Sequence, residues 1–293
     1  MAPTELPSLA VSRPRPDSEH AGSPLQAGEG HLRISRVAGQ SLPTRSLATN
    51  PLKLWSPRRP GPVSWTYAST FGGGLVAGDR IDLQVDVEPD ATAVLTTQAS
   101  TKVYRSNRSK SCRQQLTAHV NRSASLVVVP DPLVCFRGAI YEQFNRIHLA
   151  EDASLVYVDW LTGGRLARGE CWDFARVTTR LEIIREDRPL LLESLVLDPR
   201  DGPLDSPMRM GDYRCLAIVV VLGPSLAEQA QQTLETVDQS SEETGLLEAA
   251  SPLAEGVLWR IMGRSTEPVA HQLQERLGFL ADRLGETPWE RKW

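Results

Sequence analysis

Cysteine and histidine are scarce in this sequence, and neither residue type is clustered. There is no Cys-x-x-Cys or Cys-x-x-His pair, and the five histidines are scattered along the chain. The spacing that a zinc-type site requires is therefore missing. We expect the cysteines to be small buried apolar side chains of a protein in a reducing compartment. They are Cys112, Cys135, Cys171 and Cys215.

Long hydrophobic runs and an excess of basic charge are also missing. The longest unbroken apolar run, Cys215 to Leu222, is far shorter than the roughly 20 residues that span a bilayer. Residues 1–17 have no apolar core of the kind found in secretory signals. The net charge of −4 argues against a general nucleic-acid binder, which usually carries a basic excess. We therefore expect a cytoplasmic protein with no membrane segment and no nucleic-acid partner.

The composition predicts one folded domain preceded by an extension. With 293 residues and 41% apolar residues, the chain can bury a sizeable core without disulfides. Residues 1–30 are rich in Pro, Ser, Gly and Glu and show no hydrophobic periodicity. This composition is typical of disorder. Since no clear domain boundary follows, we expect a single domain over residues 31–293.

Hydrophobic periodicity predicts a mainly β protein. Residues 80–88 alternate polar and apolar, which is the period of a half-buried strand. Similar segments separated by short polar turns favour an antiparallel-rich β architecture over a βαβ fold. They are 91–98, 113–120, 125–129, 144–149, 154–161, 174–184, 190–197, 215–222 and 256–262. Residues 225–237 and 266–284 have the composition and spacing of about two C-terminal helices.

A glycine-rich segment, Phe71 to Asp79, is the first candidate for a binding site. A phosphate cradle would need a following helix and a Lys-Ser/Thr pair. A strand pattern begins instead at Arg80. We therefore predict a backbone bend that uses glycine conformations.

Two further segments carry polar side chains that could have chemical roles. Residues 95–106 combine hydroxyl groups with Lys102 and Arg105, and could bind an anion or line a polar channel. Their composition favours a strand end followed by a turn. Asp159 interrupts an apolar strand, so its carboxylate needs a partner or a polar cavity. Arg165 and Arg168 are the candidate partners, and a structural ion pair is favoured over a functional carboxylate.

Catalysis has little support in the sequence. Asp159 and Glu170 could form a glycosidase-like acid/base pair, which needs carboxyl groups roughly 5–10 Å apart across a cleft. Nothing in the sequence fixes that geometry, and no Gly-x-Ser-x-Gly or His-Glu-x-x-His motif is present. We therefore expect a protein that is not an enzyme, with a carbohydrate-active hydrolase as the less favoured alternative.

Four segments, in this order and spacing, resemble the UreD/UreH family of urease accessory proteins. The resemblance implies a β-helix-like arrangement of antiparallel and mixed sheets. It also implies a non-catalytic protein that forms a complex with a UreF-like protein and a UreG-like GTPase. Such a complex docks on apo-urease and conducts nickel to it, so that nickel is bound only transiently. The segments are 72–79, 96–106, 130–139 and 159–170.

The resemblance also implies residues of an internal nickel passage. Asp79, Thr101, Asp159 and Glu193 match acidic or hydroxyl positions along it. Oxygen ligands hold divalent nickel more weakly than thiolates or imidazoles do, and a conduit needs sites that release their ion. Arg80 departs from relatives that have a second acidic residue there. The rival hypothesis is a β-rich protein-binding scaffold unrelated to urease.

Overall fold

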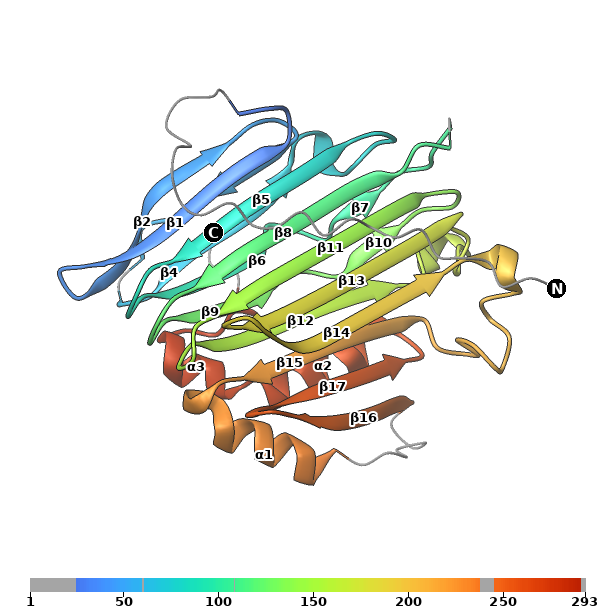
Figure 1. Cartoon of the computed structure of the whole chain (residues 1–293). Helices are drawn as coiled ribbons and strands as arrows, with labels where there is room; N and C mark the ends of the chain where they lie inside the picture. The colour runs from blue at the N-terminus through green and yellow to red at the C-terminus, as the bar shows by residue number, and fades with distance from the viewer. Residues whose placement is uncertain (1–24, 60, 108, 238–244, 291–293) are drawn as a thin grey trace.

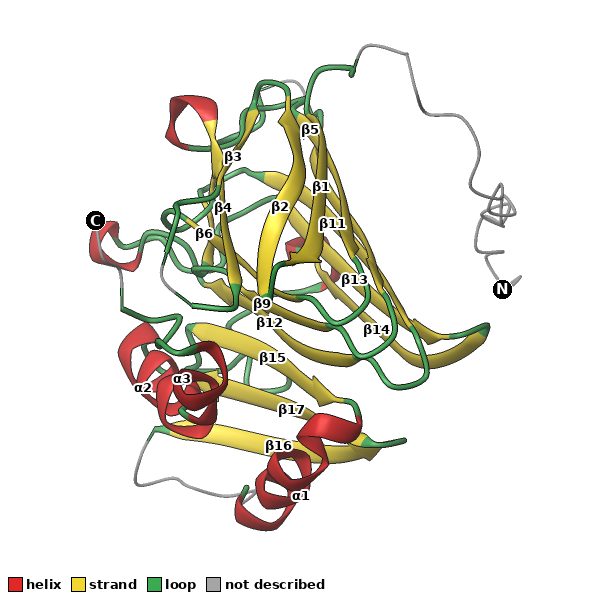
Figure 2. Ribbon diagram, turned by 90° about the vertical axis from the view of Figure 1, so that its left-hand side faces the viewer, coloured by secondary structure: helices red, strands yellow, loops and turns green. Residues whose placement is uncertain are grey.

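The computed structural model describes residues 25–59, 61–107, 109–237 and 245–290. Their strands form two sheets that face each other, and the helices lie beside one of them (Figures 1 and 2). The predicted extension, residues 1–30, lies mostly outside the described residues. Its last two residues, however, belong to strand β1, which begins at Glu29. The folded domain therefore starts two residues earlier than predicted.

The first sheet contains seven strands within the described residues. In spatial order they are β14 (Arg188–Leu197), β13 (Arg176–Arg185), β11 (Ile140–Leu149), β8 (Cys112–Val120), β5 (Arg80–Val87), β1 (Glu29–Val37) and β2 (Gln40–Ala48). The strands from β1 to β13 pair in parallel, and the two outermost pairs, β1 with β2 and β13 with β14, are antiparallel. The sheet is therefore mixed.

The second sheet has the same plan. Its main path is β16 (Leu246–Leu253), β17 (Gly256–Gly263), β15 (Cys215–Leu222), β12 (Ser154–Thr162), β9 (Ser125–Val129), β6 (Thr92–Thr97), β4 (Ser64–Thr70) and β3 (Leu52–Trp55). The short strands β7 (Lys102–Val103) and β10 (Leu133–Cys135) pair with each other, and β10 also pairs with β12. The central pairs, from β4 to β12, are parallel, and the outer pairs are antiparallel.

The chain winds between the two sheets in successive turns. It passes from β5 in the first sheet to β6 in the second, back to β8, on to β9, and then through β11, β12 and β13. Because each turn lies in parallel register on the turn before it, the arrangement resembles a β-helix. This confirms the predicted β-helix-like fold with mixed sheets.

Burial follows from this arrangement. One core lies between the two sheets, and a second lies between the outer face of the second sheet and the helices. A sheet covered on both faces has nearly continuous apolar strands. This explains the apolar run of β15, and it explains β12, whose residues alternate between the two cores.

Three α-helices are present in the described part of the chain. They are α1 (Ala227–Thr236), α2 (Thr266–Arg276) and α3 (Phe279–Leu284). Figure 2 shows them beside β15, β17 and β16. The segment predicted as one helix, 266–284, is divided at Leu277 and Gly278 into α2 and α3. Its leucine stripe is buried against the second sheet, so the prediction of about two C-terminal helices is confirmed. None of the described helices is both long and apolar enough to cross a membrane.

Candidate functional site

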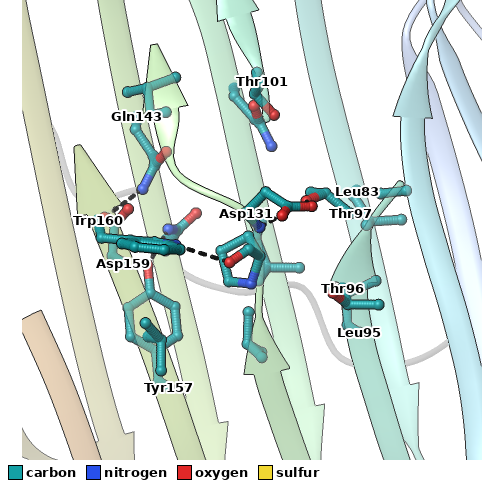
Figure 3. A pocket seen from close by; sticks show the side chains of 18 of the residues that line it. Leu83, Leu95, Thr96, Thr97, Thr101, Asp131, Gln143, Tyr157, Asp159 and Trp160 are labelled. Carbon is teal, nitrogen blue, oxygen red and sulfur yellow. Dashed lines mark hydrogen bonds between the residues drawn. The ribbon is translucent and has the colours of Figure 1, made fainter. Parts of the chain in front are cut away.

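A cavity of about 80 Å³ with both apolar and polar side chains in its wall lies between the two sheets (Figure 3). Its wall includes Gln143 from β11 of the first sheet and Asp159 from β12 of the second. Since one water molecule needs roughly 10–15 Å³ of such space, the cavity has room for several waters. Its polar lining residues are Thr96, Thr97, Thr101, Gln114, Asp131, Tyr141, Gln143, Asn145, Tyr157, Asp159 and Trp160.

Asp159 is the carboxylate at the centre of this site. The two-residue period of β12 places Asp159 on the same inward face as Leu155 and Tyr157. Gln143 Nε2 donates a hydrogen bond of 2.6 Å to Asp159 Oδ2. Burial raises the pKa of Asp159 to about 6, although hydrogen bonds from Gln143 and Tyr157 act in the opposite direction. The carboxylate is therefore held by neutral donors.

The predicted ion pair of Asp159 with Arg165 or Arg168 is wrong. Arg165 binds Glu170 instead, and this guanidinium holds the pKa of Glu170 below its ordinary value. The reason is local, because a 3-10 turn (η2, Leu166–Arg168) brings these two side chains together. Glu170 lies outside the cavity that Asp159 lines. The two carboxylates are therefore not arranged as an acid/base pair around one cleft, and the hydrolase alternative loses its geometric basis.

Thr101 connects the central cavity with a second one. The second cavity, of about 150 Å³, extends past Ser100 to Gly73, and it shares Thr101 and Gln114 with the first. At the opposite side, Asp159 also lines a small hollow of about 10 Å³ formed with Thr179 and Leu195. The central cavity shares lining residues with each of the other two spaces, so the three lie next to one another in a row.

Asp79 ends the glycine-rich segment. Its Oδ2 accepts a hydrogen bond of 2.8 Å from the backbone N–H of Val76 and closes a turn. Gly72 and Gly73 have φ values of 80° and 75°, which favour glycine, so the predicted backbone bend is confirmed. Asp79 lies outside the three spaces, and Arg80 is exposed at the start of β5.

Glu193 lies near the opposite end of the row. It is on β14, two residues before Leu195 of the small hollow, and its Oε2 is 2.5 Å from Arg260 Nη2 on β17. Of the four residues predicted for a passage, the structure thus brings Thr101 and Asp159 to one cavity. It places Glu193 beside the far end and Asp79 in the glycine turn.

Several lining residues were not predicted from the sequence. The inward positions of β11 include Tyr141, Gln143 and Asn145, which are polar where apolar side chains are usual. Asp131 also lines the cavity and accepts a hydrogen bond of 2.9 Å from Thr97 Oγ1. The sequence feature that could have revealed these lining residues is the alternation of residues 140–149, which places three polar side chains on the buried face of one strand. Among the described residues, no three His, Cys, Asp or Glu side chains come together in a group that could hold a metal ion.

Comparisons with known proteins agree on one family. The model of the UreD urease accessory protein family matches residues 26–293. The urease accessory protein UreD of Sorangium cellulosum is 44% identical, over 99% of this chain and 92% of the relative. The urease accessory protein UreD of an Anaeromyxobacter species is 40% identical, over 98% of this chain and 95% of the relative. Urease accessory protein D of Arabidopsis thaliana is 35% identical, over 89% and 99%.

Proposed function

This chain belongs to the UreD family of urease accessory proteins, and we propose that it conducts Ni²⁺ to apo-urease through the space between its two sheets. Nickel is the cargo of this process and is bound only transiently. The protein would serve as a maturation factor without catalysing a reaction and without a tightly bound cofactor.

One observation carries the proposal. Asp159 is a half-buried carboxylate between two sheets that lines a cavity with room for water. Burial raises its pKa, although its neutral donors act in the opposite direction. Burying a charge is costly unless another charge compensates it. A divalent cation in the cavity would supply that compensation. Carboxylate, hydroxyl and amide oxygens bind Ni²⁺ weakly enough to release it, as conduction requires.

The proposed path follows the row of interior spaces. Thr101 and Asp159 would contact the ion in the central cavity, Asp79 would lie toward the glycine turn, and Glu193 toward the opposite end. Because Arg80 is exposed on β5, its charge would be screened by solvent rather than directed into the passage.

The partners and location are part of the same proposal. The family resemblance supports a cytoplasmic complex with a UreF-like protein and a UreG-like GTPase that docks on apo-urease. The GTPase would supply nickel at one end of the passage, and apo-urease would receive it at the other.

The test is co-expression of the full chain with its urease subunits and the other accessory proteins, followed by nickel and activity assays of purified urease. Asp159→Ala and Asp79→Ala should lower the nickel content of urease while the complex still forms. Asp187→Ala is a matched control, because this carboxylate is exposed in the turn between β13 and β14. Normal nickel loading with both passage variants would leave the chain as a docking scaffold and refute the conduit.

A further inference from the structure

A chain of hydrogen bonds leads from uncharged side chains of β11 to Asp159. Gln143 Nε2 donates to Asp159, and Tyr141 Oη donates to Gln143 Oε1 at 2.8 Å. Asn145 Nδ2 donates to Tyr157 Oη at 2.5 Å. The Tyr157 side chain lies on the same inward face of β12 as Asp159 and lowers the pKa of that carboxyl.

The orientation of the Gln143 amide follows from its two neighbours. An ionised carboxylate can only accept hydrogen bonds, so the Gln143 NH₂ group must face Asp159. The Gln143 oxygen must then accept, and Tyr141 supplies the proton. Tyr141 Oη is also 3.1 Å from Gln114 Oε1, but its single proton is directed to the closer oxygen, on Gln143. Asp159 thus selects the amide orientation, and Tyr141 supplies a hydrogen bond to the amide oxygen that this orientation directs away from the carboxylate.

The Gln143 contact crosses the space between the sheets. Gln143 is on β11 in the first sheet and Asp159 on β12 in the second, and both side chains line the central cavity (Figure 3). A carboxylate has about four acceptor positions, and the hydrogen bond from Gln143 occupies one of them. Others remain for a ligand in the cavity.

The ion pairs elsewhere in the protein are built differently. Glu193, Glu170 and Asp198 each contact an arginine. Such a guanidinium satisfies the charge of the carboxylate and competes with a cation for it. Gln143 orients its carboxylate without adding a positive charge to the cavity. This distinction suits a site that must receive a cation and then release it.

We propose that Gln143, whose amide oxygen is hydrogen-bonded by Tyr141, is a positioning residue that holds the Asp159 carboxylate in the orientation that receives the transferred Ni²⁺. This inference rests on the proposed conduit function and adds residues of β11 to it. Tyr141 and Gln143 act through Asp159 and need not touch the ion.

The experiment is a double-mutant cycle in the complete complex. The initial rate of nickel incorporation into apo-urease is measured with NiCl₂ for Gln143→Leu, Asp159→Asn and the double variant. Because the hydrogen bond to the charged carboxylate is lost, Gln143→Leu should slow incorporation roughly tenfold or more. In the Asp159→Asn background, Gln143→Leu should cause no further loss.

The second arm uses Tyr141→Phe, which removes one oxygen atom from a buried ring and keeps its shape. This variant should slow incorporation less than Gln143→Leu does, and the two together should equal Gln143→Leu alone. Gln84→Leu is the matched control, because Gln84 is exposed on β5 of the same sheet. Thermal unfolding of each variant establishes that it is folded, and Tyr141→Phe keeps the test decisive if Gln143→Leu does not fold.

The outcomes separate this inference from the function on which it rests. Full-rate incorporation with Asp159→Asn would refute the positioning role, and normal loading with Asp159→Ala and Asp79→Ala as well would refute the conduit. A slow Asp159→Asn variant beside a normal Gln143→Leu variant would refute only the positioning role. Additional loss from Gln143→Leu in the Asp159→Asn background would show that Gln143 acts independently of Asp159, which also overturns the inference.

Discussion

Glu193 and Arg260 form an ion pair that joins the two sheets, with Glu193 on β14 and Arg260 on β17. Their side chains are 18% and 38% exposed, so solvent reaches the pair. Asp159, in the centre of the same interior, is held instead by Gln143 and Tyr157. These two predicted passage residues, Glu193 and Asp159, therefore differ in charge balance, and their substitution should have different effects.

Glu193→Ala should destabilise the protein modestly and reduce nickel incorporation. A partly exposed ion pair contributes at most about 1 kcal/mol. The larger effect on incorporation arises because Arg260 would be left without its counter-charge near the passage and would repel Ni²⁺. The measurements are urea unfolding and the nickel content of urease.

The control for Glu193 is the double variant Glu193→Ala/Arg260→Ala, which removes both charges. It should incorporate more nickel than Glu193→Ala alone. If it does not, the charge of Arg260 does not govern passage, and the loss reflects the missing oxygen ligand of Glu193.

Asp159→Asn should stabilise the protein while it impairs nickel transfer. The pKa of Asp159 is raised from 3.8 to about 6, so the folded state binds its proton more tightly than the unfolded state does. Stability is therefore lost as pH rises from about 4 to about 6, and at pH 7 the ionised carboxylate costs about 1–3 kcal/mol. Urea unfolding at pH 7 should show this gain for Asp159→Asn.

The pH dependence of that gain is its control. Below about pH 3 the carboxyl is protonated in both states, so Asp159→Asn and the original protein should have nearly equal free energies of unfolding. A gain that persists unchanged below about pH 3 would have another cause than the buried charge.

The contribution of Asp198 to folding stability should depend on pH in the opposite way. Hydrogen bonds from the side chain and backbone N–H of Arg200 lower the pKa of Asp198 to about 2. Its stabilising effect is therefore complete above about pH 4 and lost as pH falls to about 2. Because Arg200 is 77% exposed, we expect Asp198→Asn to cost only about 1 kcal/mol at pH 7. Unfolding of both proteins followed from pH 7 to pH 2 should show the difference disappear, whereas a constant difference would contradict this account.

The glycine turn offers a prediction about space and backbone conformation. At Gly74, a Cβ would lie 2.6 Å from the Tyr104 ring and 2.7 Å from the backbone oxygen of Lys102, so Gly74→Ala should cost about 1–3 kcal/mol. At Gly72 there is open space but φ is 80°. Asparagine tolerates that conformation, so Gly72→Asn should cost less than Gly72→Ala. Thermal unfolding should show a larger loss of stability for Gly74→Asn than for Gly72→Asn, because only position 74 lacks space for a side chain. Equal losses for these two variants would contradict this explanation.

Local patterns in the sequence determined much of the fold. The alternation of residues 80–88 specified β5, because side-chain direction in a strand has a period of two. The glycines of residues 72–78 specified a bend, and the order of four segments indicated the family. The resemblance indicated a β-helix-like arrangement, since alternation does not distinguish a β-helix from a sandwich. The expectation of an antiparallel-rich architecture was wrong for the central strands of both sheets, which pair in parallel. Alternation has the same period in parallel and antiparallel strands, so it could not reveal this. Strand β16, with its small and polar residues, gave no strand signal.

Only the tertiary structure decided what surrounds Asp159. The sequence placed a carboxylate in an apolar strand and suggested nearby arginines, but Arg165 turns to Glu170. The partner, Gln143, comes from the other sheet, and a shift of one residue in either strand would direct its side chain away from the interior. Contacts across the two sheets depend on how successive turns of the chain are stacked, and no local pattern encodes that register. The sequence by itself thus determined which residues carry charge and which strand faces they occupy, and the stacking of the two sheets decided which of them meet.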